Sequence, residues 1–163
     1  MSTTDEVLAA ARHLVQAFGR HDTAAYFDCF APDATFIFHT TAARLASRAE
    51  YQRLWRQWED EDEFRVLSCA SGHPVVQDLG DAGVFSHDVT TVIRTRTGEQ
   101  TLTERETIVF RRDGDRWTAV HEHLSPQPGP EAVPEPLETG GRRPRDRRSR
   151  RSALFFRARM VAS

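Results

Sequence analysis

Two histidines flank a glutamate within residues 112–126, which read RDGDRWTAVHEHLSP. Imidazole exchanges protons near neutral pH and also binds zinc, whereas a carboxylate in a pocket serves as a general acid or base. If this stretch is a strand, alternation places His121 and His123 on one face and Glu122 on the other. The residues therefore fit an acid–base site, a metal site that adds His87 from a nearby strand, or packing at an interface.

His39 is a second candidate for acid–base chemistry, because it ends the strand-like stretch ATFIFHT and an unperturbed imidazole titrates near neutral pH. A hydrogen-bonded position at the rim of a pocket explains it equally well. Trp55 and Trp58 share one face of a predicted helix. Indole rings of this kind serve either as the wall of a ligand pocket or as core.

Three helices are predicted before the main run of strands. The first begins with the capping-box pattern Thr3-Thr4-Asp5-Glu6 and ends at Gly19; the second is capped by Asp22 and ends before Pro32. The third begins at the capping box Ser47-Arg48-Ala49-Glu50. We expect the acidic run at 59–63 to lie in a solvated turn, because negative charge is unfavourable at the C-terminal end of a helix.

From Phe64 onward the hydrophobic period changes to two, which predicts strands at about 64–71, 74–79, 84–97, 100–112 and 116–125. Helices followed by an antiparallel meander indicate an α+β domain in which the helices cover one face of a curved sheet. The opposite face needs a cover of its own. A second copy of the same sheet supplies one, so we expect a homodimer.

Charge divides the 163 residues into an acidic body and a basic tail. Residues 1–141 hold 13 Arg against 23 acidic residues, whereas residues 142–163 hold nine Arg against Asp146. We therefore expect a domain at 1–126, a Pro/Gly-rich linker at 127–141 and a disordered Arg-rich tail at 142–163. The tail favours at most nonspecific contact with nucleic acid. No secretory signal and no membrane-spanning run is evident, which predicts a cytoplasmic protein without a membrane partner.

The order of these elements, together with YFDCFAPDATF and the closing DGDRWTAVHEHLSP, resembles the SnoaL-like branch of the nuclear transport factor 2-like superfamily. The resemblance covers about residues 5–126. It implies a cone of three N-terminal helices packed on a curved, mostly antiparallel sheet, with a deep pocket between them and a dimer through the outer face. Relatives of this kind include polyketide cyclases, ketosteroid isomerases and kinase association domains, so the fold does not select one function.

The residues that such relatives use are mostly missing here. By the resemblance, Phe38 stands where the steroid isomerases have their Asp base and Leu14 where they have a Tyr donor, and neither moves a proton. Kinase association domains carry arginines in the pocket, and the matching positions read Arg94, Thr107 and Leu124. One of three basic positions is kept.

The resemblance also implies which side chains share the pocket. If Leu124 points inward, Glu122 does too, and His121 and His123 point away toward the dimer face. The expected set comprises Glu122, Arg105 and His39 as catalytic residues, with Trp55, Trp58, Asp88, Arg94, Thr107 and Leu124 as ligand-binding residues. A structural ion-pair network among Asp88, Arg105 and Glu122 is the alternative.

Two classes of function follow from this pocket. One is a small enzyme that acts on an apolar or polycyclic ligand by acid–base chemistry of the isomerase, cyclase or hydrolase type. In it Glu122 or His39 exchanges a proton and Arg105 stabilises developing negative charge. The other is a ligand-binding or association module without turnover, and the sequence does not choose between them. No phosphate loop or zinc motif is present, so we expect no cofactor and no metal.

Overall fold

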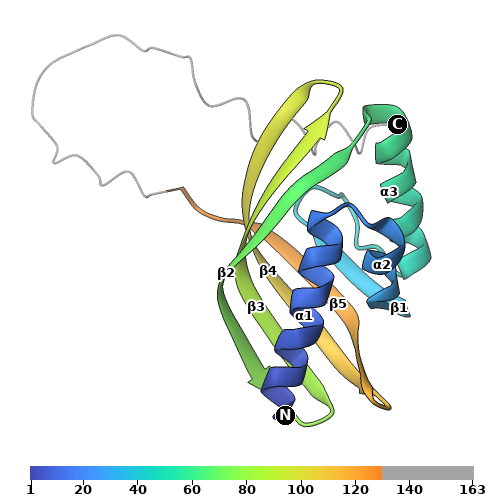
Figure 1. Cartoon of the computed structure of the whole chain (residues 1–163). Coiled ribbons are helices and arrows are strands. Elements are labelled where there is room, and N and C mark those ends of the chain that lie inside the picture. The colour runs from blue at the N-terminus through green and yellow to red at the C-terminus, as the bar shows by residue number, and fades with distance from the viewer. Residues whose placement is uncertain (130–163) are drawn as a thin grey trace, which may run out of the picture.

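The computed structural model describes residues 1–129 of the chain. Two helices, a strand and a third helix come first, and four long strands follow. The three helices lie against one face of a curved five-stranded sheet (Figure 1). The α+β cone predicted from the sequence, with N-terminal helices on a mostly antiparallel sheet, is confirmed.

The first two helices begin at capped residues. α1 (Thr3–Gly19) is capped by Ser2, whose Oγ accepts a hydrogen bond from the Asp5 backbone N–H, while the Asp5 carboxylate accepts one from the Ser2 N–H. The capping box thus begins one residue before the predicted Thr3. α2 (Thr23–Asp28) is capped by Asp22, as expected.

The third helix, α3 (Arg48–Asp62), begins at Ser47 as predicted but ends later than expected. The prediction that the acidic run at 59–63 forms a turn is wrong, because the helix continues to Asp62. Glu59 accepts a hydrogen bond from the Trp55 indole at 2.9 Å and lies 2.8 Å from Nε2 of His21. The first of these contacts lies within the helix and the second is a tertiary contact, and together they offset the unfavourable interaction of Glu59 with the helix dipole.

The five strands are β1 (Phe30–Phe38), β2 (Arg65–Asp78), β3 (Ala82–Thr95), β4 (Gly98–Asp113) and β5 (Arg116–Pro126). Their order in the sheet is β1-β5-β4-β3-β2, with β1 parallel to β5 and the other neighbours antiparallel. The two strands predicted at about 64–71 and 74–79 form one continuous strand, β2, and Gly72 does not separate them. An irregularity lies inside β2 at this point, where the register shifts between Gly72 and Val75 and His73 has a positive φ of 49°.

The inner face of the sheet carries bulky apolar residues that pack against the helices. Ile108 and Phe110 on β4, with Phe85 and Ile93 on β3, are almost fully buried. Cross-strand pairing places Leu124 opposite Glu106, and Glu106 in turn opposite His87. Two polar side chains, Glu106 and His87, therefore lie side by side among the apolar residues of this face.

Within the described residues the last strand, β5, ends at Pro126. The predicted linker beyond Gly129 and the Arg-rich tail at 142–163 lie outside the described residues. Within residues 1–129, no helix is both long enough and apolar enough to span a bilayer.

Candidate functional site

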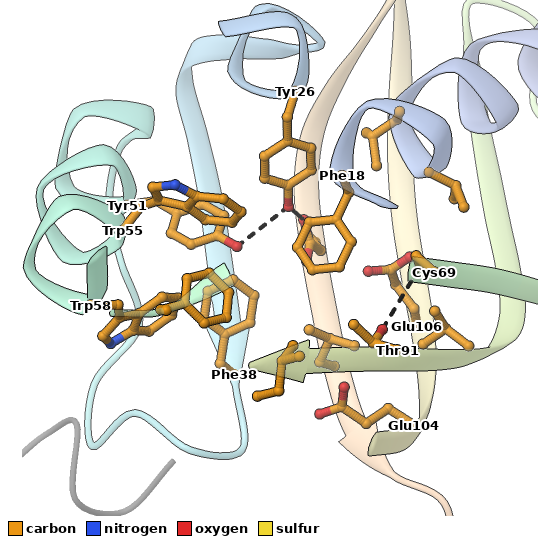
Figure 2. A pocket seen from close by; sticks show the side chains of 17 residues that line it. Phe18, Tyr26, Phe38, Tyr51, Trp55, Trp58, Cys69, Thr91, Glu104 and Glu106 are labelled. Atoms are coloured by element: carbon orange, nitrogen blue, oxygen red, sulfur yellow. Dashed lines mark hydrogen bonds between the residues drawn. The ribbon is translucent and has the colours of Figure 1, made fainter. Parts of the chain in front are cut away.

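A cavity lies between the three helices and the inner face of the sheet, at the place where the pocket was expected (Figure 2). Its volume is about 30 Å³, which holds roughly two water molecules. Its lining consists of Leu14, Val15, Phe18, Tyr26, Phe38, Tyr51, Trp55, Trp58, Phe64, Cys69, Val89, Thr91, Ile93, Glu104, Glu106, Glu122 and Leu124. The wall is therefore aromatic and aliphatic, with three carboxylates set into it.

The aromatic side of the cavity comes mainly from α3. Tyr51, Trp55 and Trp58 recur at helical spacing on its buried face, so all three rings project toward the sheet (Figure 2). Tyr26 from α2 joins them, with its ring centroid 5.6 Å from that of Trp55. Trp55 and Trp58 thus lie at the cavity as expected, while also belonging to the hydrophobic core.

Glu122 lies on β5 and is 1% exposed. Tyr26 donates a hydrogen bond from Oη to Glu122 Oε2 at 3.2 Å, and the Oη of Tyr51 lies 3.4 Å from that of Tyr26. Burial, followed by the negative charge of Glu122, raises the pKa of Tyr26 well above its usual range. Tyr26 therefore remains a neutral donor that orients the carboxylate in the cavity.

Glu106 belongs to a hydrogen-bonded chain that crosses three strands. His87 Nε2 lies 2.5 Å from Glu106 Oε2, and His87 Nδ1 lies 2.6 Å from the Oγ of Ser71 on β2. Burial lowers the pKa of His87 to about 4, so its ring carries one N–H at neutral pH. With Glu106 as a carboxylate, that N–H lies on Nε2 and Nδ1 accepts from Ser71. The chain links the cavity wall to an exposed residue of β2.

His39 does not line the cavity but contacts a residue that does. Its Nε2 lies 2.6 Å from Oε1 of Glu104, whose side chain is 5% exposed, whereas that of His39 is 31% exposed. The pair stands at the end of β1 and bridges to β4. His39 therefore occupies the hydrogen-bonded rim position considered from the sequence, next to a buried carboxylate.

The prediction of which residues of β3 and β4 point into the pocket is wrong, because the alternation is shifted by one residue. Arg105 and Thr107 on β4 lie on the outer face, and Arg105 is exposed. Asp88 and Arg94 on β3 lie on that face too. The expected contact of Arg105 with Glu122 is therefore not formed, because Arg105 stands beside Asp88 in the neighbouring strand instead.

These outer residues have other partners. Asp88 Oδ2 is 2.9 Å from His73 Nδ1, and Arg94 pairs with Glu99 at 2.9 Å. The alternative ion-pair network of Asp88, Arg105 and Glu122 is not formed either, since Glu122 lies on the opposite face. Within residues 1–129, the cavity lining contains no arginine.

The orientation expected for β5 matches the structure. Glu122 and Leu124 line the cavity, whereas His121 and His123 point to the outer face. His121 Nδ1 is 2.8 Å from Oγ1 of Thr35, and burial, with His123 nearby, lowers the pKa of His121. In the part of the chain that the structure describes, no group of three or more His, Cys, Asp or Glu side chains is placed to hold a metal ion.

Several residues of the site were missed from the sequence: Glu104 and Glu106 on the cavity wall, His87 behind Glu106, and Tyr26 and Tyr51 on the aromatic side. A signal for the first three was present. Glu104 and Glu106 share their alternation with the bulky Ile108 and Phe110 of the same strand, and His87 shares its alternation with Phe85 and Val89. The large apolar residues of a strand therefore predict its inward face more reliably than a pocket position inferred from a related family.

A second hollow of about 330 Å³ lies beside the start of α1, between Met1 and Trp117. Its main carboxylate, Glu6, already accepts hydrogen bonds from Arg112 at 2.8 Å and from the Trp117 indole at 2.9 Å. The guanidinium of Arg112 also lies 4.6 Å from the Trp117 ring centroid. This cluster joins α1 to the sheet, so its role is structural. The cavity between the helices and the sheet is the better candidate for a functional site.

Similar folds occur in solved structures. An NTF2-like protein from Cytophaga hutchinsonii matches with a TM-score of 0.67 at 12% identity, covering 78% of this chain and 100% of that one. The CaMKII hub of S. rosetta matches with a TM-score of 0.62 at 21% identity, covering 78% and 98%. A putative calcium/calmodulin-dependent protein kinase II association domain from Xanthomonas campestris matches with a TM-score of 0.63 at 19% identity, covering 76% and 86%.

Identities at this level establish a shared fold and nothing finer. A search among curated proteins finds no significant match. A family model described as "SnoaL-like domain" matches residues 7–129, which include all three helices and all five strands apart from the first turn of α1. The chain therefore belongs to the SnoaL-like domain family, and its fold resembles that of an NTF2-like protein.

Proposed function

We propose that this protein binds a small, largely apolar molecule in the cavity and that Glu122 exchanges a proton with it. The observation that carries the proposal is a carboxylate, 1% exposed, held by Tyr26 on the wall of an aromatic cavity. Buried carboxylates are costly, and one that faces a cavity is a candidate for general acid–base work. The SnoaL-like fold supports a ligand pocket without specifying a reaction.

The remaining groups supply supporting roles in this proposal. Tyr26 positions the Glu122 carboxylate through the 3.2 Å hydrogen bond. His39 and Glu104 stand together at the rim, where the 2.6 Å contact between their side chains holds the Glu104 carboxyl group in place. Arg105 receives no role in the reaction, since it lies on the other face of the sheet.

The size of the cavity limits the ligand. A polycyclic molecule does not fit into about 30 Å³ unless aromatic side chains move, whereas a compact molecule needs smaller rearrangements. Phe18 from α1 and Trp58 from α3 both line the cavity (Figure 2), so rotation of either ring would enlarge it. We therefore favour a compact ligand.

Two neighbouring threonines of β3 provide a matched test of ligand binding. Thr91 is 3% exposed and lines the cavity, whereas Thr90 points to the outer face. Replacing Thr91 with Phe should fill the cavity and abolish retention of a copurified small molecule, measured by native mass spectrometry. Thr90→Phe should retain it, and circular dichroism shows whether both variants fold. Equal retention by both variants would remove the cavity as the binding site.

Turnover has a test of its own. Once a ligand is identified, Glu122→Gln should lower the rate constant by about 10²–10⁴, the usual contribution of a positioned acid or base. The amide keeps the shape of the side chain but cannot exchange the proton. An unchanged rate would leave a binding protein without acid–base chemistry at Glu122.

A second candidate function is an association module that forms a homodimer through the outer face. The likeness in fold to a kinase hub and to a kinase association domain favours it. So does the row of partly exposed Val84, Val109 and His121, which are paired across β3, β4 and β5 on that face. Ending the chain after Gly129 and weighing the product by light scattering tests it. A dimer supports association through the body, and a folded monomer rejects it.

A further inference from the structure

A serine, a histidine and a glutamate form one hydrogen-bonded chain across three strands. Ser71 Oγ lies 2.6 Å from Nδ1 of His87, and Nε2 of His87 lies 2.5 Å from Oε2 of Glu106. The three residues come from β2, β3 and β4, so the sheet itself sets their spacing. A hydroxyl within hydrogen-bond reach of a base, with a third group that orients the base, is the arrangement that activates a nucleophile.

The imidazole in the middle of this chain is enclosed. The side chain of His87 is 0% exposed, and burial lowers its pKa to about 4, so the ring is neutral at physiological pH. A neutral ring has one N–H and one bare nitrogen. When Nε2 donates to Glu106, Nδ1 is bare and accepts from the Ser71 hydroxyl. This tautomer requires only that Oε2 of Glu106 accepts a hydrogen bond, and it does not depend on the charge of Glu106 or on its other contacts.

Ser71 is the member of the chain that solvent reaches. It is exposed on the edge strand β2, whereas His87 and Glu106 are buried. Ser71 pairs with Val89 and stands two residues after Cys69, and both of these neighbours line the cavity. A molecule that approaches this edge of the sheet therefore meets the hydroxyl beside the cavity rather than inside it.

The backbone directly after Ser71 departs from a regular strand. The register with β3 shifts between Gly72 and Val75, and His73 has a positive φ of 49°. Irregularities of this kind are frequent beside active sites, where they aim a side chain or hold strain. The bulge thus supports a functional role for this stretch independently of the hydrogen bonds.

We infer that Ser71 is a nucleophile for acyl transfer from a small carboxylic ester, with His87 as its general base and Glu106 as the residue that positions the imidazole. The Oγ of Ser71 forms a bond to the carbonyl carbon while its proton moves to Nδ1 of His87. The bond from that carbon to the alcohol oxygen then breaks, and the alcohol leaves with the proton. Water releases the acid from Ser71 by the same steps, so ester and water give acid and alcohol. This activity uses other groups than the proposed proton exchange at Glu122.

Diisopropyl fluorophosphate tests the nucleophile, because it modifies activated serines and leaves ordinary ones unchanged. The Oγ–P bond forms, the P–F bond breaks, and the hydroxyl proton passes to His87 as fluoride leaves. Peptide mass spectrometry of the treated full chain should find the adduct on Ser71. Ser68 is an exposed serine of the same strand, and it should be labelled at least about 10² times more slowly.

Hydrolysis of p-nitrophenyl acetate gives a matched contrast between the two serines. Ser71→Ala should lower the rate by about 10² or more, whereas Ser68→Ala should leave it unchanged. His87→Gln should slow labelling of Ser71 by about 10²–10⁴, the usual contribution of a general base. Both serines are exposed, so we expect their variants to fold. If circular dichroism shows that His87→Gln does not fold, the two serine variants decide the test alone.

Two measurements report on the roles of His87 and Glu106 rather than on their packing. Nitrogen-15 NMR at neutral pH should show His87 protonated at Nε2 and bare at Nδ1. Glu106→Gln, whose amide can donate to Nε2, should partly reverse this tautomer and slow labelling. Labelling by the wild type should change by less than about twofold between about pH 7.5 and 5.5, because the base titrates with a pKa of about 4. A base with the usual pKa of about 6.5 would lose about tenfold over that range.

Several outcomes would overturn the inference. Equal labelling of Ser71 and Ser68, or no labelling of either, would mean that the hydroxyl is not activated. A proton on Nδ1 of His87 would leave Ser71 without a base. A tenfold loss of rate from about pH 7.5 to 5.5 would assign the base to a different histidine.

Discussion

The two faces of the sheet are built from alternate residues of the same strands, yet they have opposite characters. On the inner face, Glu104, Glu106 and Glu122 stand among aromatic rings. On the outer face, Arg105 lies beside Asp88, and Arg94 pairs with Glu99. The outer face thus places opposite charges beside one another, whereas the inner face gathers carboxyl groups among aromatic rings. Paired surface charges contribute little to stability, so the unusual face, and the one that suggests function, is the inner one.

The largest difference between the faces should be seen in stability. Ile108 and Val109 are neighbours on β4, and Ile108 is fully buried on the inner face whereas Val109 is partly exposed on the outer one. Ile108→Ala should lower the free energy of unfolding by about 2–5 kcal/mol through loss of burial and cavity formation. Val109→Ala should cost below about 1 kcal/mol, measured by urea denaturation. Equal costs would mean that the outer face is also covered in solution.

The next effect concerns two histidines of opposite exposure. The unfolded His87 binds a proton near its usual pKa of 6.5, whereas the folded one stays neutral down to about 4. The unfolded state binds more protons between these values, so the free energy of unfolding falls as the pH is lowered through this window. The loss attributable to His87 is on the order of 3 kcal/mol.

Denaturation at a series of pH values measures this dependence. His87→Gln should flatten the profile between about pH 6.5 and 4 relative to the wild type. His73→Gln, at a residue whose side chain is 88% exposed, should leave the profile unchanged. A wild-type profile that is already flat in this window would contradict the neutral His87.

Adjacent residues of β5 give a third contrast, smaller in energy. Glu122→Gln should weaken binding of a cognate ligand by about tenfold and leave the oligomeric state intact. His121→Ala should loosen the proposed dimer and leave ligand affinity nearly unchanged. Calorimetry and analytical ultracentrifugation measure the two properties. A joint loss of both in either variant would point to general destabilisation and would remove the separation of the faces.

Removal of metal ions is expected to have no effect on stability. Metal binding to a structural site contributes to folding free energy, so removal of a metal lowers the melting temperature. If His121 and His123 are interface residues, EDTA should leave the melting temperature within experimental error. A decrease of several degrees would assign the outer histidines to a metal.

The sequence predicted the elements well because hydrophobic periods and caps are local. Asp22 and Ser47 cap their helices as expected. Helical periodicity also predicted that Trp55 and Trp58 line the cavity. The family resemblance implied that Leu124 points inward, and strand alternation then placed Glu122 on the same face.

The face of a strand is harder to predict because a shift of one residue reverses it. Pairing in the structure sets Leu124 opposite Glu106 rather than Thr107, and the register shifts again between Val109 and Phe110. Neither fact is contained in any one strand. The helical end of α3 also depends on a distant residue, because His21 supplies the partner of Glu59. Long-range contacts of this kind have no local signal.

The position of β5 in the sheet has a consequence for how the protein is made. Among residues 1–129 it is the last strand to be synthesised, yet it lies between β1 and β4, and its pairing with β1 joins residues as far apart as Phe30 and Ala119. Until residues 116–126 leave the ribosome, β1 has no neighbour in the sheet and the cavity lacks Glu122. A chain that stops before β5 therefore leaves the inner apolar face open where β5 would lie, and it should be recognised by chaperones or degraded rather than accumulate as a folded protein.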